Sequence, residues 1–436
     1  MGDINTAMPQ VARLDNGLRV VVTTQPHLSL TSIIMLVRVG SRYEDPADNG
    51  LSHLLEHVLF RGCDAYPDTH SLNAAIESVG TALDAATAPD FTTFEAVCLP
   101  ARVPAMLEIV GSMLGKPHLS GVDVEQRIIA EELQDEIDAR GRDIDPDNLS
   151  KMKLFPGSSM GLKVGGTLAG IKRFDEDDCR RWHGRFYAAA NMVLSVAGPT
   201  TLEEAVAAAQ HAFGSLPTGT LQEPQAASIR SELPAFEYTQ HAGPQADLQL
   251  SWVLPPESHP DWAPLLMAQR LLDDGTCARL RHRVVDQLGL AYHAGADLEV
   301  YSGLSIFTVS TQTRPNQAVK VIDAIFEVLD ELATVPADAS ELRRMHSRID
   351  LEIAGMRDSA GQAAYWNGLA ELHPGTAAIS ERWRRTLAVT SDDLMRAVRV
   401  HLDRRRVQLT AVGDLEPVWR ANLRHRIRSA SGAVGE

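Results

Sequence analysis

The stretch Leu51-Ser52-His53-Leu54-Leu55-Glu56-His57-Val58-Leu59-Phe60 decides the fold prediction for the first half of the chain. We predict that it is a helix. His53 and His57 are four residues apart, so a helix places both imidazoles on one face. Glu56 follows His53 by three residues and lies on the same side. An apolar helix has no packing reason to accept three ionisable groups, which indicates a functional site.

The spacing of these three residues is typical of a catalytic metal centre. Two neutral imidazoles four residues apart can bind one ion, and imidazole suits Zn²⁺. Glu56 is then placed to take a proton from the attacking water. The order His-x-x-Glu-His is the inverted form of the more common metalloprotease signature. The alternative is a buried helix with two hydrogen-bonded core histidines and an exposed glutamate.

Composition excludes several classes of protein. The chain has 436 residues, 44% hydrophobic and 22% charged, which is typical of a globular protein with two or more domains. Its net charge of -16 argues against a nucleic-acid partner. No apolar run is long enough to span a membrane. The first residues, 1–6, lack a signal peptide, and the scattered cysteines form no CxxC pair, so we expect a cytoplasmic protein.

The chain divides into two halves of similar organisation. We expect an N-terminal domain over 1–216, a Pro- and Gly-containing linker over 217–234 and a C-terminal domain over 235–436. Strands are predicted at 18–24, 31–39, 81–97 (two pieces), 192–197, 246–253, 291–301, 304–313 and 407–412, and helices at 71–79, 104–114, 122–139, 175–186, 261–287, 319–332, 340–356 and 392–402.

The end of each half repeats at a fixed offset of 215 residues. Paired aspartates start a helix, and a strand then ends in glycine, at Gly198 and again at Gly413. This self-similarity predicts a duplicated domain. The same offset carries His53 to Ala268 and His57 to Leu272. Only the first copy therefore retains metal chemistry.

A third metal ligand is expected from the predicted helix at 122–139. A catalytic zinc takes three protein ligands and keeps one position for water. Glu125 and Glu132 are seven residues apart and share a face, whereas Glu131 and Glu136 point elsewhere. The alternative is a solvated acidic helix face.

These motifs together resemble the M16 family of metallopeptidases. The first is His53-x-x-Glu56-His57, followed about 75 residues later by the spacing of Glu125 and Glu132. The resemblance covers most of the chain, and its further matches are Phe60-Arg-Gly62, Tyr66-Pro67, Gly80, Asp84-Ala85, Gly161, Gly166-Thr167, Ile171, Phe186-Tyr187, Asn191-Met-Val-Leu194, Gly198 and Gly289-Leu-Ala-Tyr292.

The resemblance implies a site, a fold and an activity. Glu132 is the third zinc ligand, and Glu125 supports the site from behind the ligands. The implied fold class is α+β, with two homologous domains that each have an antiparallel sheet with helices on one face. The implied activity is zinc-dependent endopeptidase cleavage in an enclosed chamber, with Glu56 as the catalytic base.

Two departures from the family pattern concern substrate binding. The family often has Asn before Ala in the strand that pairs with substrate, where this chain has Asp84 and Ala85. The family also has an Arg seven residues before the Tyr that matches Tyr292, and here that position is Val285. Arg281 lies one helical turn earlier and is an alternative source of the guanidinium.

The absence of the family's Arg at the position of Val285 predicts that a partner subunit supplies it. Small two-domain members of the family can act as pairs, one subunit carrying zinc and the other the Arg/Tyr pair. We therefore expect this chain to be the zinc-bearing subunit of a heterodimer, with a homodimer as the alternative. The competing function is a non-catalytic peptide-binding or structural subunit of an M16-type complex. A hydrolase using Ser or Cys has no nucleophile-elbow motif behind it.

Overall fold

A computed structural model describes residues 8–373 and 375–429, and these residues form two compact units. Unit 1 takes its described residues from the segments Met1–Gln134, Leu162–Ala226 and Leu351–Ser380. Unit 2 takes its described residues from Asp135–Gly161, Ala227–Asp350 and Glu381–Glu436. Each unit is therefore assembled from parts of both halves of the sequence.

Unit 1 is built on a six-stranded sheet in the order β1-β2-β6-β3-β5-β4. Its strands are β1 (Gln10–Arg13), β2 (Arg19–Thr24), β3 (Thr31–Val37), β4 (Asp84–Thr87), β5 (Thr92–Cys98) and β6 (Met192–Gly198). The pairs are antiparallel except for β2 and β6, which run parallel and are separated in the sequence by the other strands β3, β4 and β5 and by helices.

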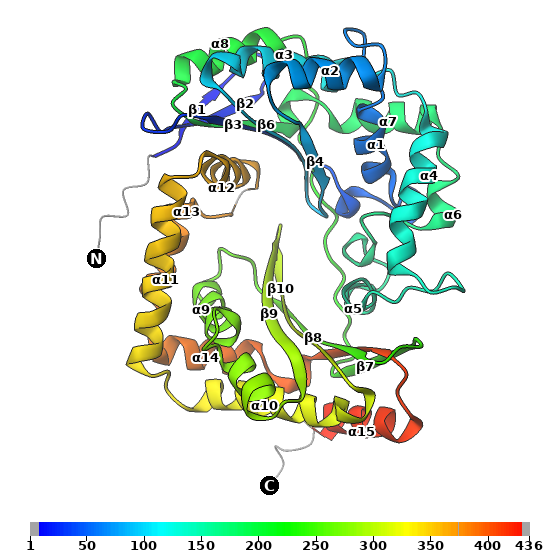
Figure 1. Cartoon of the computed structure of the whole chain (residues 1–436), viewed down its shortest axis with the longest axis vertical. Helices are drawn as coiled ribbons and strands as arrows, with labels where there is room; N and C mark the ends of the chain where they lie inside the picture. The colour runs from blue at the N-terminus through cyan, green and yellow to red at the C-terminus, as the bar shows by residue number, and fades with distance from the viewer. Residues whose placement is uncertain (1–7, 374, 430–436) are drawn as a thin grey trace. The chain divides into compact units, whose positions relative to one another are not determined.

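One face of this sheet carries the main core of unit 1. Alternate residues of β3, such as Ile33 and Met35, point into that core, which includes Leu54 and Leu55 of the motif helix. The helices on this side are α1 (Leu51–Leu59), α2 (Thr69–Val79), α3 (Val103–Gly115), α4 (Val122–Glu132), α6 (Leu168–Ile171), α7 (Glu176–Phe186) and α8 (Leu202–Phe213). Figure 1 shows α2, α3 and α8 over the sheet and the other helices of this side, among them α1, α4 and α7, next to them.

The opposite face of the sheet is covered by a helix from much later in the sequence. Ile34 and Leu36 of β3 pack against Ala363 and Ala364 of α12 (Ala360–Leu372), which crosses beneath the sheet (Figure 1). The Ser195 hydroxyl donates a hydrogen bond of 2.7 Å to the Ala364 carbonyl. The predicted α+β class is confirmed, but helices cover both faces of this sheet because both faces are apolar.

Unit 2 repeats this plan with a five-stranded sheet in the order β7-β11-β8-β10-β9. Its strands are β7 (Ala235–Gln240), β8 (Ala246–Leu254), β9 (Ala291–Tyr301), β10 (Leu304–Thr313) and β11 (Gln408–Gly413). The β7–β11 pair is parallel and the others are antiparallel. The helices are α5 (Pro146–Leu154), which packs on β8 and β11, then α9 (Trp262–Asp273), α10 (Ala318–Thr334), α14 (Ser391–His401) and α15 (Pro417–Ser429). Helices α11 (Ala339–Arg357) and α13 (Ile379–Leu387) each have residues in both units, because the segment Leu351–Ser380 belongs to unit 1.

The predicted repeat at an offset of 215 residues is present in the secondary structure. Helix α7 begins at Glu176 and α14 at Ser391, and strands β6 and β11 end at Gly198 and Gly413. Each helix also begins with a capping box whose third residue is an aspartate. The units therefore share their closing helix–strand element.

In the part of the chain that the structure describes, no helix is both long enough and apolar enough to cross a bilayer. Residues 1–7, on which the expected absence of a signal peptide depends, lie outside the described residues.

Candidate metal centre

Helix α1 brings the two motif histidines together. The Nε2 atoms of His53 and His57 face each other at 3.2 Å, and the two rings are 4.7 Å apart at an interplanar angle of 89°. This separation is close to that of two ligands each about 2.0–2.1 Å from one tetrahedral zinc ion. The four-residue spacing of the motif thus places the two Nε2 atoms where both could bind one metal ion.

Glu132, the last residue of α4, adds a carboxylate to the pair. Its Oε2 atom lies 3.8 Å from the Nε2 atoms of both His53 and His57. Its side chain is 49% exposed, whereas the imidazoles are largely covered. We call these three residues the His–His–Glu cluster. The structure brings together the three residues that the sequence analysis predicted as ligands.

Glu125 lies behind His57 and fixes its tautomer. The Nδ1 atom of His57 donates to Glu125 Oε2 at 3.2 Å, since a carboxylate can only accept. Glu125 is buried and also pairs with Arg61 at 3.3 Å. Burial disfavours the charged imidazole, but the Glu125, Glu132 and Glu56 carboxylates outweigh it and raise the pKa of His57. In the neutral ring, the lone pair is on Nε2, toward the cluster.

His53 has the opposite electrostatic environment. Burial and the neighbouring His57 lower its pKa to about 4, so His53 is neutral at physiological pH. Its Nδ1 atom is buried and has no hydrogen-bond partner among the residues that the structure describes. The donor set of two neutral imidazoles and a carboxylate fits a divalent metal such as zinc and is one ligand short of a closed tetrahedral site.

Glu56 lies on the same helix but makes a different contact. Its side chain is buried, and its Oε2 atom accepts a hydrogen bond of 2.5 Å from the Thr87 hydroxyl. Burial raises the pKa of the Glu56 carboxyl, and the Thr87 hydrogen bond acts in the opposite direction. A carboxyl with a raised pKa accepts a proton more readily, as a general base requires.

Helix α1 is held firmly at its start. Its first residues have no side-chain cap of their own, and the buried carboxylate of Glu44 accepts 2.8 Å hydrogen bonds from the backbone N–H groups of Gly50 and Ser52. The positive end of the helix dipole also stabilises a carboxylate at this position. Gly50 has a φ of 95°, and an added Cβ would lie 2.9 Å from Gly166 Cα. Glycine is thus required at both sides of this contact.

The residues predicted to bind substrate lie on two edge strands. Asp84 is exposed and Ala85 half-buried on β4, at the edge of the sheet of unit 1. Tyr292 is 91% exposed near the start of β9, at the edge of the sheet of unit 2. Val285 is half-buried in the short π-helix Arg281–Gln287, and Arg281, the first residue of that helix, is exposed.

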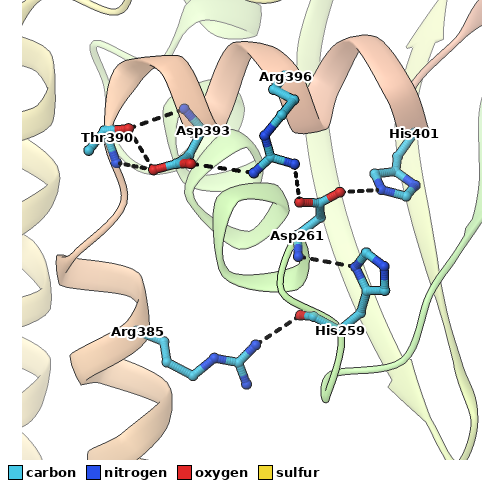
Figure 2. Close-up of polar contacts among 7 residues, drawn as sticks. All are labelled: His259, Asp261, Arg385, Thr390, Asp393, Arg396 and His401. Atoms are coloured by element: carbon cyan, nitrogen blue, oxygen red, sulfur yellow. Dashed lines mark hydrogen bonds and ion pairs between the residues drawn. The ribbon is translucent and has the colours of Figure 1, made fainter.

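A second cluster of ligand-type residues, in unit 2, was not predicted from the sequence. His259, Asp261 and His401 place one nitrogen or oxygen each within 4.8 Å of one another. Figure 2 shows that these atoms already have partners. Asp261 Oδ2 accepts from His401 Nε2 at 2.9 Å, and Oδ1 accepts from Arg396. His259 Nδ1 accepts from the Asp261 backbone N–H at 3.1 Å.

We call this second group, His259, Asp261 and His401 with Arg396, the α9–α14 link. Burial disfavours the ionised carboxyl, but Arg396 and His401 outweigh it and lower the pKa of Asp261. A guanidinium on the carboxylate opposes the binding of a further cation. The group therefore joins the start of α9 to α14. No local spacing reveals it, because Asp261 and His401 are 140 residues apart.

Comparison with known families identifies the chain. A model described as Insulinase (Peptidase family M16) matches residues 19–156, and one described as Peptidase M16 inactive domain matches residues 173–348. The chain belongs to peptidase family M16. The first matched segment of this M16 chain contains the His–His–Glu cluster, Glu56 and Glu125, and the second contains Tyr292.

Several M16 relatives resemble the chain over different lengths. An uncharacterized zinc protease of Streptomyces coelicolor is 28% identical over 418 residues, covering 92% of this chain and 89% of that protein. The mitochondrial-processing peptidase subunit beta of Blastocladiella emersonii is 30% identical over 219 residues, covering 50% of this chain and 46% of that protein. A crystal structure of a protease from Helicobacter pylori has a TM-score of 0.85 at 18% identity and covers 93% of this chain and 99% of its own, which confirms the fold.

Proposed function

We propose that the chain is a zinc-dependent endopeptidase. The observation that carries this proposal is the convergence of the His53 and His57 Nε2 atoms with the Glu132 carboxylate, with Glu56 on the same helix. Membership of a family with relatives named zinc proteases supports zinc as the ion. The enclosed chamber implied by the family resemblance stays a prediction.

His53, His57 and Glu132 would hold the ion, and Glu125 would keep His57 in the ligating tautomer. Zinc, when bound, polarises a peptide carbonyl and lowers the pKa of a water molecule to about 7. The Glu56 carboxylate takes the proton of the attacking water and delivers it to the leaving amide nitrogen. Thr87 donates to one Glu56 oxygen, which leaves the other to move the proton.

The substrate we propose is an extended peptide. The free edge of β4, with Asp84 and Ala85, is suited to receive it as an added antiparallel strand. A four-residue edge strand with small side chains allows close approach of another backbone. Tyr292 is the proposed contact from the second domain, and its exposure leaves the phenol free to meet a ligand.

We also propose that the chain works with a second M16-type subunit. Val285 stands where the resemblance calls for Arg, so the guanidinium comes from a partner or, in a homodimer, from Arg281. A relative that is by name a subunit, the mitochondrial-processing peptidase subunit beta, supports this proposal. All four cysteines are free thiols, which supports a reducing, cytoplasmic location.

The second candidate function is a non-catalytic peptide-binding or structural subunit. The observation that favours it is Val285, since the chain lacks the Arg of the substrate-binding pair. The buried Glu56 opposes it, because a binding protein has no need to bury a carboxylate beside the ligand residues. Zinc binding without peptide cleavage, by the chain alone and together with any M16-type chain encoded next to it, would favour this function.

The test of the proposed function is Glu56→Gln. The variant removes the base and keeps the three ligands, so it should hold about one zinc per chain and lose peptide cleavage. Cleavage of a fluorogenic peptide library is measured with the chain alone and with any M16-type chain that is encoded next to it. The matched control is Glu131→Gln, an exposed glutamate on α4. Wild-type cleavage by Glu56→Gln would contradict the assignment.

A further inference from the structure

Thr87 stands out because it makes the side-chain hydrogen bond of the proposed base. Its hydroxyl donates to Glu56 Oε2 at 2.5 Å, and no other side chain in the described part of the chain hydrogen-bonds to Glu56. Glu56 is 8% exposed, so protein groups rather than bulk water set the orientation of its carboxylate. A hydrogen bond from a hydroxyl to an ionised carboxylate is among the stronger kinds.

The Thr87 hydroxyl lies beside the Thr92 hydroxyl of the neighbouring strand, and because each hydroxyl donates its one proton elsewhere, this contact is not itself a hydrogen bond. Thr87 Oγ1 lies 3.3 Å from Thr92 Oγ1, and the buried Thr92 hydroxyl donates to the Val39 carbonyl at 3.1 Å. Thr87 and Thr92 form the last pair of the β4–β5 ladder. The hydroxyl is therefore fixed by the pairing of two strands.

The turn that follows Thr87 is also rigid. Asp90 in this turn forms a buried 2.7 Å ion pair with Arg42. The Arg42 backbone N–H donates to the Pro89 carbonyl at 3.0 Å. A Cβ added to Gly40 would lie only 2.0 Å from the Ala88 carbonyl oxygen, so the turn packs directly on the Gly40 backbone. These contacts hold the end of β4 in one place.

We propose that Thr87 is a positioning residue, which fixes the Glu56 carboxylate and couples it to strand β4. The proposal rests on the proposed peptidase function. The hydroxyl holds Oε2 and leaves Oε1 to exchange the proton with the attacking water. The same strand carries Asp84 and Ala85, so the backbone edge offered to a peptide and the orientation of the base are set by one short element.

The test compares Thr87→Val with Thr87→Ser in the zinc-loaded protein and its M16-type partner. Valine keeps the β-branched shape that suits a strand and removes the hydroxyl, whereas serine keeps the hydroxyl. We expect Thr87→Val to lower kcat by about tenfold to a hundredfold, the loss of one charge-assisted hydrogen bond, with KM changed by less than about twofold. Thr87→Ser should restore kcat to within about threefold of wild type. Thr81→Val, at a half-buried threonine before β4 that makes no hydrogen bond with Glu56 in the described structure, is the matched control and should match wild type.

A second measurement does not depend on activity. Crystal structures of the zinc-loaded variants should show the Glu56 carboxylate displaced in Thr87→Val and in its original place in Thr87→Ser. An unmoved carboxylate in Thr87→Val, unchanged kcat in that variant, or loss of zinc from it would each overturn the proposal. If the wild-type pair cleaves no peptide, the proposed function fails, and the crystal structures still decide whether Thr87 positions Glu56.

Discussion

Two groups of two histidines and one carboxylate occur among the described residues, and they differ in their hydrogen bonds. In the α9–α14 link, Asp261 contacts both Arg396 and His401, and His259 accepts a backbone N–H. In the His–His–Glu cluster, the Nε2 atoms meet only each other, and the Glu132 carboxylate lies 3.8 Å away. The difference is that Asp261 is already neutralised by Arg396, whereas the ligand atoms of the His–His–Glu cluster contact only one another.

The two groups also differ in the charges of the side chains around them. Arg396 supplies the positive charge that neutralises Asp261 in the α9–α14 link. Around His57, the near carboxylates are Glu125, Glu132 and Glu56, and Arg61 is paired with the first of them. With Arg61 paired to Glu125, the Glu132 and Glu56 carboxylates leave an excess of negative charge near the histidines, which attracts a metal ion. The predictions below test this contrast.

The largest effect is expected from replacing a ligand. His57→Ala removes one of three ligands, so zinc content should fall from about one equivalent per chain to near zero. The measurement is mass spectrometry of the metal in the purified, dialysed protein. His401→Ala is the matched change in the α9–α14 link and should keep its zinc. An equal loss of zinc from His57→Ala and His401→Ala would show that the His–His–Glu cluster and the α9–α14 link do not differ in metal binding.

A smaller effect is expected from the residue behind the ligands. Glu125→Gln weakens the hold on the His57 tautomer, and zinc affinity should fall by about tenfold to a hundredfold. Competition against a chromophoric chelator gives the dissociation constant. Glu131→Gln, on an exposed position of the same helix, serves as the control. An unchanged affinity would show that Glu125 only pairs with Arg61.

The smallest effect is expected in the α9–α14 link, and it concerns stability alone. Asp261→Ala leaves Arg396 and His401 without their carboxylate and should lower the free energy of unfolding by about 1–3 kcal/mol. Zinc content should not change. Urea unfolding curves measure the difference, with the exposed Asp350→Ala as a control. Loss of zinc from Asp261→Ala would contradict this account.

The pH dependence of that difference follows from the lowered pKa of Asp261. A carboxyl whose folded pKa lies below its unfolded value stabilises the fold above the unfolded value, near 3.9. This contribution is lost as the pH falls through the folded pKa. The gap between wild type and Asp261→Ala should therefore narrow below about pH 4.

The contrast between the two groups also shows what the sequence can predict. His53, Glu56 and His57 belong to one helix, so their spacing alone predicts their shared face. From the residues alone, both Glu125 and Glu132 are candidates for the third ligand. The family resemblance is what indicates Glu132. In the structure Glu132 reaches the cluster from the last residue of α4, whereas the predicted helix extended to residue 139. The α9–α14 link depends on a contact 140 residues apart, which no local pattern reveals.

In the fold, too, the sequence predicted the local elements but not the contacts between distant segments. The offset of 215 residues correctly predicted the closing helix and strand of each unit, because capping aspartates and terminal glycines are local signals. Helices α5 and α12 were not predicted. Each packs on a sheet formed mainly by the other half of the sequence, so its apolar residues have a partner only after folding. The parallel β2–β6 and β7–β11 pairs likewise depend on distant contacts.

Anomalous X-ray diffraction at the zinc absorption edge tests the central claim most directly. Crystals of the wild-type chain grown with zinc should show an anomalous peak bounded by His53, His57 and Glu132, within about 2.0–2.2 Å of each ligand atom. No peak should appear between His259, Asp261 and His401. A peak at the α9–α14 link, or none at the His–His–Glu cluster, would contradict the account.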